Sequence, residues 1–209
     1  MKIAVVAANG KAGQLIVEEA VKRGHDVTAI VRSENKTQAQ HLLKKDLFDL
    51  TKEDLAGYDV VATAFGAWTA ETLPLHSQSI EHFNDLLAGT NTRFLVVGGA
   101  GSLYVDKEKK VRLVDTAEFP AEYKPLASAQ ADELDLLRTK KDLNWTFVSP
   151  AAEFIPDGAH TGEYILAGDF FTVNEAGESK ISYADYAIAF VDEIESGKHI
   201  QERISVLGK

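Results

Sequence analysis

AANGKAG, residues 7–13, joins a short apolar run to a segment with helical spacing, and this turn decides the fold. In nucleotide-binding turns, glycines make the bend, let the backbone approach a pyrophosphate and let the helix pack on its strand. Gly10 and Gly13 have the spacing of the last two such glycines, and Ala7 stands in place of the first. Asn9 tolerates a positive φ and can share the bend. The context predicts a dinucleotide-binding unit, with an ordinary strand-to-helix turn as the alternative.

The chain alternates apolar runs with helical segments, which is typical of buried parallel strands joined by helices. The predicted strands are Ile3–Ala8, Val27–Val31, Val60–Phe65, Phe94–Val97 and Trp145–Val148, with a weaker one at Leu42–Lys45. The predicted helices are Ala12–Arg23, Thr51–Ala56, Leu75–Ala88 and Ala127–Thr139. Left-handed caps are expected at Gly24, Gly57 and Gly89. Right-handed crossovers then give a Rossmann-like α/β fold, a doubly wound, mainly parallel sheet with helices on both faces and a ligand crevice at the carboxyl ends of its strands.

After Pro150 the pattern changes to a loop rich in proline and glycine. The elements expected beyond it are a β-like stretch at Phe170–Val173, a helix at Tyr183–Glu195 and a strand at Arg203–Val206. This segment is too short to build a core of its own. We therefore predict a single NAD(P)-binding domain over 1–209, with a dinucleotide-binding core at 1–150 and a dependent C-terminal lobe at 151–209 that covers the substrate.

Composition narrows the classes of function. With 22 basic and 32 acidic side chains, the net charge is −10 and would repel a nucleic-acid backbone. The absence of cysteine excludes disulfides, thiolate nucleophiles and iron–sulfur clusters. The six histidines show no metal-ligand spacing, so we expect no metal site and most histidines at the surface. No signal-peptide pattern and no run of ~18 apolar residues is present, which predicts a cytoplasmic protein without a membrane partner. The oligomeric state stays open.

The end of the second predicted strand bears on the choice of dinucleotide. NAD-binding proteins usually place Asp or Glu there, to accept hydrogen bonds from the ribose hydroxyls. Residues 29–36 instead read AIVRSENK, with Arg32 in that region. A guanidinium fork suits a 2′-phosphate, so we expect NADP(H) to be preferred over NAD(H). A solvated arginine is the alternative, and Lys36 could share or replace its role.

Several motifs, taken in order, resemble the atypical short-chain dehydrogenase/reductase group of NAD(P)H-binding, NmrA-like proteins. Within that group they are most similar to the NADH-flavin reductases akin to biliverdin/flavin reductase. The motifs are AANGKAG, VTAIVR, KKDLFD, TAFGA, VVGGAGSL, NWTFVSPA and GESKISYADYAIAFVDEIE. The resemblance covers nearly the whole chain, and the ordered set is more specific than any one motif.

The resemblance implies which residues hold the dinucleotide. The implied set is Asn9, Gly10, Lys11, Ala12 and Gly13 at the pyrophosphate, Arg32 at the ribose phosphate, Asp46 near the adenine, Ala64, Phe65 and Gly66 beneath the dinucleotide, Gly98, Gly99 and Ser102 after the fifth strand, and Ser149, Pro150 and Ala151 beside the nicotinamide. Simpler roles stay open: Asp46 can cap a turn, Phe65 can belong to the core, and the glycines of GGAGS can shape a loop.

One departure from the wider superfamily bears on mechanism. Its ordinary members use a Tyr-x-x-x-Lys pair to move a hydroxyl proton, and none of the six tyrosines here has a lysine four residues later. Alcohol and sugar oxidation need such a group. An isomerase or dehydratase of nucleotide-linked sugars is therefore disfavoured. Hydride transfer from nicotinamide C4 to flavin N5 requires mainly that the protein hold the two rings face to face, since water can supply any further proton.

Placement of that kind needs flat apolar walls. Phe65, Trp68, Tyr104 and Phe154 fall on loops at the predicted carboxyl edge, where they could stack on a planar acceptor. Ordinary loop packing is the alternative for each, and no catalytic acid or base is assigned.

The leading hypothesis is an NAD(P)H-dependent oxidoreductase that reduces a flavin or a similar flat small molecule. FMN or riboflavin would be its substrate rather than a tightly bound group. The alternative is a non-catalytic, NmrA-like redox sensor that binds NADP and thereby changes its affinity for a protein partner.

Overall fold

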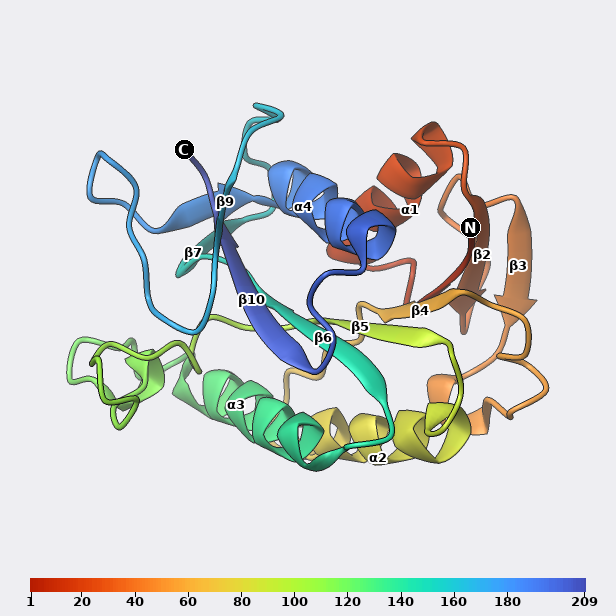
Figure 1. Cartoon of the computed structure of the whole chain (residues 1–209), viewed down its shortest axis with the longest axis horizontal. Coiled ribbons are helices and arrows are strands. Elements are labelled where there is room, and N and C mark those ends of the chain that lie inside the picture. The colour runs from red at the N-terminus through yellow and green to blue at the C-terminus, as the bar shows by residue number, and fades with distance from the viewer.

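The strands of the main sheet lie in the order β3-β2-β1-β4-β5-β6-β10-β8 in a computed structural model that describes residues 1–209 (Figure 1). The strands of this sheet are β1 (Lys2–Val6), β2 (Asp26–Val31), β3 (His41–Lys44), β4 (Val60–Thr63), β5 (Arg93–Val97), β6 (Asn144–Ser149), β8 (Ile165–Ala167) and β10 (Glu202–Leu207). A separate parallel pair consists of β7 (Glu153–Ile155) and β9 (Lys180–Ser182). The helices are α1 (Lys11–Lys22), α2 (Leu75–Leu87), α3 (Lys124–Thr139) and α4 (Tyr183–Ser196).

The main sheet reverses its winding at β1. All pairings are parallel except that of β8, which runs antiparallel to β10. The chain proceeds from β1 to β2 and β3 on one side, then returns to β4 and β5 on the other. Val6 at the end of β1 is in register with Ile30 and Thr63, so the loops after β1, β2 and β4 leave the sheet together. Ligand crevices of doubly wound sheets lie at such a point. The predicted Rossmann-like α/β fold is confirmed.

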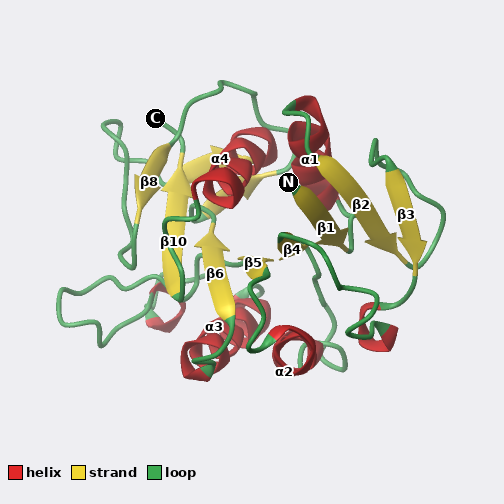
Figure 2. Cartoon of the chain, turned by 45° about the vertical axis from the view of Figure 1, so that its right-hand side comes forward, coloured by secondary structure: helices red, strands yellow, loops and turns green.

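Helices cover both faces of the sheet (Figure 2), and a hydrophobic core lies on each face. On one face α1 and α4 pack side by side, with Ile16 and Phe190 fully buried. The α4 residue Tyr186 is also buried, and its hydroxyl donates to the Val148 carbonyl at 2.8 Å. On the other face α2 and α3 pack together. Because α4 and β10 complete these layers, the segment after residue 150 shares the core of the preceding residues.

Two predicted elements do not form as expected. Residues 51–56 are a series of turns rather than a helix. The Asp54 carboxylate accepts from the Thr51 backbone and from Lys45, so the segment is held by a side chain instead of helical hydrogen bonds. Phe170–Val173 makes only an isolated bridge from Phe170 to Tyr104. The three predicted left-handed glycines are confirmed, with φ values of 81°, 83° and 74° for Gly24, Gly57 and Gly89.

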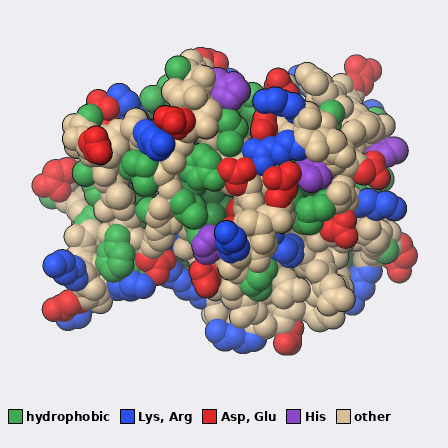
Figure 3. Space-filling model, turned by 45° about the horizontal axis from the view of Figure 1, so that its top comes forward, with side chains coloured by type: hydrophobic (Ala, Val, Ile, Leu, Met, Phe, Trp, Pro, Cys, Tyr) green, Lys and Arg blue, Asp and Glu red, His purple; other side chains and the backbone are tan.

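The surface carries both signs of charge. Figure 3 shows acidic and basic side chains interspersed over the visible face, separated by apolar and neutral atoms. No helix of the fold combines the length and the apolar character that a membrane crossing requires.

Candidate functional site

The loops at the carboxyl ends of β1 to β6 surround one cavity of about 1470 Å³. Pockets for a single small ligand usually measure roughly 300–1,000 Å³. This cavity therefore has room for a dinucleotide and for a second, smaller molecule beside it. It lies at the edge where the sheet reverses its winding, which is the position expected from the sequence.

The turn after β1 bends at Ala7. This residue has φ = 57°, a left-handed conformation that costs an ordinary residue about 1–2 kcal/mol and suits glycine. Ala7 itself, and not Asn9, therefore makes the bend that the first glycine of the motif usually makes. Gly10 is the N-cap of α1, with no side-chain cap, and Gly10, Lys11 and Ala12 line the cavity. The unpaired N–H groups of the first helical turn form a site suited to an anion.

Gly13 lies behind this turn and does not line the cavity. A Cβ atom built on Gly13 would come within 2.9 Å of the Ala7 carbonyl oxygen and of the Ala8 Cα and carbonyl oxygen. A Cβ on Gly10 would lie 3.5 Å from the Ala7 oxygen, which is an ordinary contact. Gly13 thus permits α1 to approach β1 closely, and this approach fixes where the N-terminus of α1 points.

Asn9 connects the turn to the segment that follows β2. Its side-chain amide donates to Ser33 Oγ at 3.1 Å and to the Glu34 carbonyl at 2.8 Å, and its Oδ1 accepts from the Lys36 backbone N–H at 2.9 Å. Asn9 lines the cavity. Its three hydrogen bonds show a positioning role that the sequence did not indicate, which is to hold the segment that carries Arg32.

Arg32 and Asp46 meet at the end of the cavity near β2 and β3. The Arg32 side chain is 82% exposed, and its Nη1 lies 3.8 Å from Asp46 Oδ2. Asp46 also caps the following 3-10 turn by accepting from the Phe48 N–H at 3.0 Å. Asp46 therefore caps this turn, which was one of the roles left open for it, and it also lines the cavity. Arg32 is held only by this long ion pair, so its guanidinium can turn toward a ligand.

Most residues implied for the other half of the dinucleotide also line the cavity. These are Ala64, Phe65, Gly66, Gly98, Gly99, Pro150 and Ala151. Gly98 and Gly99 permit close packing, since a Cβ on Gly98 would overlap the Phe147 ring and one on Gly99 would overlap the Gln130 side chain.

Ser102 and Ser149 do not line this cavity, contrary to expectation. Both are buried, and each hydroxyl accepts from Nη1 of Arg203 at 3.3 Å. Arg203 on β10 is fully buried in its side chain, and its Nε donates to Asp169 at 2.9 Å. The hydroxyls of both serines thus serve as hydrogen-bond acceptors for the buried guanidinium of Arg203. No local sequence signal predicted this cluster, because Arg203 comes from a strand near the other end of the chain.

Tyr104 is likewise absent from the cavity wall. Its ring lies between Lys109, Arg112 and Arg138, whose charged groups are 6.0, 5.8 and 5.9 Å from the ring centroid. Its hydroxyl accepts from Arg138 at 3.3 Å. Partial burial acts to raise the pKa of Tyr104, but Arg112 and Arg138 outweigh it and hold this pKa below its ordinary value. Tyr104 therefore anchors a loop, and it is not a wall for an acceptor.

The remaining predicted aromatic residues do line the cavity. Trp68 is 72% exposed, and its indole lies close over Gly66. The Phe65 ring lies 5.8 Å from that of His76, and Phe154 stacks on Tyr183 with 3.8 Å between ring centroids. Sequence reasoning missed another part of the cavity wall, which includes Phe119, Pro120, Tyr123, Leu126 and Gln130. These residues belong to an irregular loop and to the start of α3, where no motif marked them.

His76 is a further wall residue that the sequence did not single out. It is only 1% exposed, in contrast to the surface position expected for most histidines. Its Nε2 lies 3.3 Å from the Ala67 nitrogen and 3.2 Å from the Ala67 oxygen. Its Nδ1 lies 3.4 Å from Oε2 of the buried Glu133 on α3. His76 thereby fixes the backbone between Phe65 and Trp68.

The His76–Glu133 pair holds more protons in the folded state than in the unfolded state. Burial raises the pKa of Glu133, against the lowering effect of His76. Burial acts to lower the pKa of His76, but Glu133 outweighs it and raises this pKa. Because both groups are more protonated when folded, their contribution to stability falls as the pH rises from about 4.5 to above 6.5.

The variant Glu133→Gln is therefore expected to lose stability less steeply than the parent chain between about pH 5 and pH 8. In that variant Glu133 no longer raises the pKa of His76, and burial, which outweighs the Ala67 hydrogen bond, lowers this pKa, so the contribution of His76 changes sign. Denaturant unfolding at several pH values measures the two slopes. Asp132→Asn, an exposed change on the same helix, is the control. Parallel slopes for the parent chain and Glu133→Gln would show that the pair does not titrate on unfolding.

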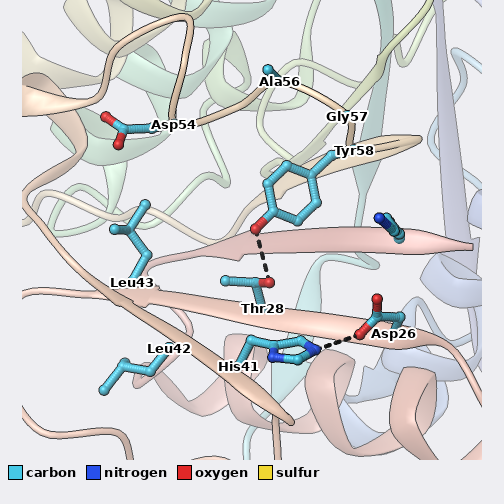
Figure 4. Close-up of a pocket in the computed structure, with 10 residues that line it drawn as sticks. Asp26, Thr28, His41, Leu42, Leu43, Asp54, Ala56, Gly57 and Tyr58 are labelled. Carbon is cyan, nitrogen blue, oxygen red and sulfur yellow. Dashed lines mark hydrogen bonds and ion pairs between the residues drawn. The ribbon is translucent and has the colours of Figure 1, made fainter.

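A second, smaller pocket lies at the opposite edge of the sheet. It measures about 470 Å³ and is lined by residues near the starts of β1 to β4 (Figure 4). Its polar groups are already paired: Tyr58 donates to Thr28 at 2.8 Å, and His41 Nε2 lies 2.8 Å from Asp26 (Figure 4). Ligands of parallel sheets bind at the carboxyl ends of the strands, so this hollow is not the candidate site.

Comparisons with known proteins agree with this geometry. Residues 7–196 match a family model described as NAD(P)H-binding. The uncharacterized protein YwnB of Bacillus subtilis is 49% identical over 212 residues, which cover 100% of this chain and 99% of YwnB. The crystal structure of SP1627 from Streptococcus pneumoniae, described as a candidate NADH-flavin reductase, is 73% identical, covers 100% of both chains and has a TM-score of 0.99. A candidate exported protein from Burkholderia pseudomallei is 42% identical over 99% of both chains, with a TM-score of 0.85. The chain belongs to the NAD(P)H-binding family that this family model describes.

Proposed function

We propose that the protein is an NADPH-dependent reductase that passes hydride to a flavin or a similar flat acceptor. The observation that carries this proposal is the single large cavity, which joins an anion site at the start of α1 to a chamber walled by aromatic side chains. The likeness to SP1627, described as a candidate NADH-flavin reductase, supports the same reaction class. A cytoplasmic location stays a prediction from the sequence.

The residues present fit a dinucleotide. Gly13 allows the close helix–strand approach that a pyrophosphate site needs, and a methyl group there would collide with backbone. Gly10, Lys11 and Ala12 would bind the pyrophosphate, while Arg32 and Asp46 would flank the adenosine ribose. Phe65, Gly66, Gly98 and Pro150 would border the nicotinamide. When bound, NADPH supplies a hydride from C4 of its nicotinamide ring.

The side chains around the acceptor would act by placement. Trp68 and Phe154 offer flat apolar faces to the chamber, and Tyr123, another wall residue, is 59% exposed. Flavin N5 accepts the hydride, and water supplies the proton that completes the reduced flavin. Well-oriented reactants can gain several powers of ten in rate from proximity alone. Among the wall residues, His76 is turned toward Ala67 and Glu133, so we give it a positioning role rather than that of an acid.

The preference for NADPH over NADH would rest on Arg32. Replacing Arg32 with alanine should remove one charge-assisted contact to the 2′-phosphate. Such contacts contribute roughly 1.5–3 kcal/mol, and the high exposure of Arg32 favours the lower figure, about a tenfold loss of affinity. Titration calorimetry with NADPH and NADH measures the effect, and NADH binding should change little. Equal losses for both would show that Arg32 does not contact the phosphate.

A spectroscopic screen tests the proposed function. Oxidation of NADPH and of NADH would be followed with FMN, riboflavin, quinones and biliverdin as acceptors. The proposal expects turnover with at least one flat acceptor and a preference for NADPH. Tight binding of NADPH without oxidation by any acceptor would instead favour the redox sensor.

A further inference from the structure

The charged residues of the large cavity are divided between its two halves. All its lysines and arginines, namely Lys11, Arg32 and Lys45, belong to the half formed by the loops after β1, β2 and β3. The other half, formed by the loops after β4, β5 and β6 and by α3, has no lysine or arginine in its wall. Its exposed charged residues are Glu118 and Glu153.

Neither of these carboxylates is neutralised by an ion pair. Lys180 is the partner of Glu153 in the β7–β9 register, but its ammonium group pairs with Glu178 at 2.7 Å and does not line the cavity. His76, the other ionisable group of this half besides the tyrosines, is buried against Glu133. The acceptor chamber is therefore apolar and aromatic, with a negative rim and no cation to meet an anionic substituent.

A phosphate placed in this chamber would meet repulsion from the two carboxylates and no compensating cation. The dinucleotide half differs, because it offers phosphate the N-terminus of α1 and the exposed cations Lys11 and Arg32, whose ion pairs with Asp157 and Asp46 are long, at 3.7 and 3.8 Å. We propose that the acceptor chamber selects planar acceptors that carry no phosphate or other anionic group, so that riboflavin is used in preference to FMN. This inference rests on the proposed function and narrows its substrate class. The isoalloxazine ring is the same in both flavins, so the difference comes from the side chain of the flavin.

The ratio of kcat/KM for riboflavin to that for FMN, at saturating NADPH, measures this selectivity. Two carboxylates near a doubly charged phosphate should favour riboflavin by roughly tenfold at low ionic strength. The ratio should fall toward one as salt screens the repulsion. Glu118→Gln and Glu153→Gln should each lower the ratio, and Glu118→Lys should lower it further. Glu175→Gln, an exposed change outside the cavity wall, is the control and should leave the ratio unchanged.

Binding measurements separate this inference from the proposed function. Riboflavin and FMN would be titrated into the complex with NADP⁺ and followed by the quenching of flavin fluorescence. If neither flavin is reduced, the proposed function fails. The inference is still supported if riboflavin binds more tightly than FMN and if Glu118→Gln reduces this difference in affinity. Equal or tighter binding of FMN at low salt, unaffected by the two glutamine variants, would overturn it even if both flavins are reduced.

Discussion

Replacing Gly13 with valine is expected to abolish NADPH binding. Even the Cβ atom would lie 2.9 Å from backbone atoms of Ala7 and Ala8, and backbone cannot move aside as a flexible side chain can. The start of α1 would have to shift away from β1, taking with it the N–H groups that we assign to the pyrophosphate. Titration calorimetry should show a loss of at least about 100-fold, because both the anion site and its orientation are lost.

Lys22→Ala is the control for this change. Lys22 is exposed in the last turn of the same helix and does not line the cavity, so NADPH binding should be unchanged. The fold of each variant is checked by its unfolding transition. A folded Gly13→Val protein that binds NADPH as tightly as the parent chain would contradict the assignment of this turn to the pyrophosphate.

Replacing Trp68 with alanine is expected to slow hydride transfer by about 10²-fold. The indole is 72% exposed and packs over Gly66, so its removal should leave the fold intact while the acceptor ring loses one wall. Trp68→Phe keeps an aromatic face and should lose far less. Rapid mixing of the NADPH complex with riboflavin isolates the hydride step from binding and release.

Tyr104→Phe distinguishes placement from proton donation in the same assay. The Tyr104 ring lies among Lys109, Arg112 and Arg138 and outside the cavity, so this change should leave both acceptor affinity and the hydride step nearly unaltered. The opposite ranking, with Tyr104→Phe inactive and Trp68→Ala near normal, would mean that a proton donor controls the reaction.

The sequence predicted those features that depend on local pattern. Buried strands such as β1 and β5 contain continuous apolar runs, and the turn at residues 7–13 is recognisable from its glycines and its position between strand and helix. Arg32 lines the cavity because the end of β2 must lie beside the end of β1 in a parallel sheet. Such relations follow from topology, which the alternation of elements already indicates.

Features set by distant contacts were not predictable in this way. Ser102 and Ser149 lie at or beyond the ends of strands that border the cavity, yet both hydroxyls accept hydrogen bonds from Arg203 instead of lining the cavity. Tyr104 lies on a loop at the correct edge but is held by Arg138 of α3 and by Arg112 further along the same loop. His76 carries no local mark of its pairing with Glu133, because α2 and α3 are separated by β5 and a long loop.

The most direct test of the proposed reaction is a single turnover under anaerobic conditions. The protein, loaded with one equivalent of NADPH, is mixed with riboflavin, and the absorbance of each is followed with time. We predict that one flavin is reduced for each NADPH oxidised, and that deuterium at the transferred position of nicotinamide C4 slows both signals together. NADPH that stays bound and reduced beside oxidised riboflavin would contradict the account.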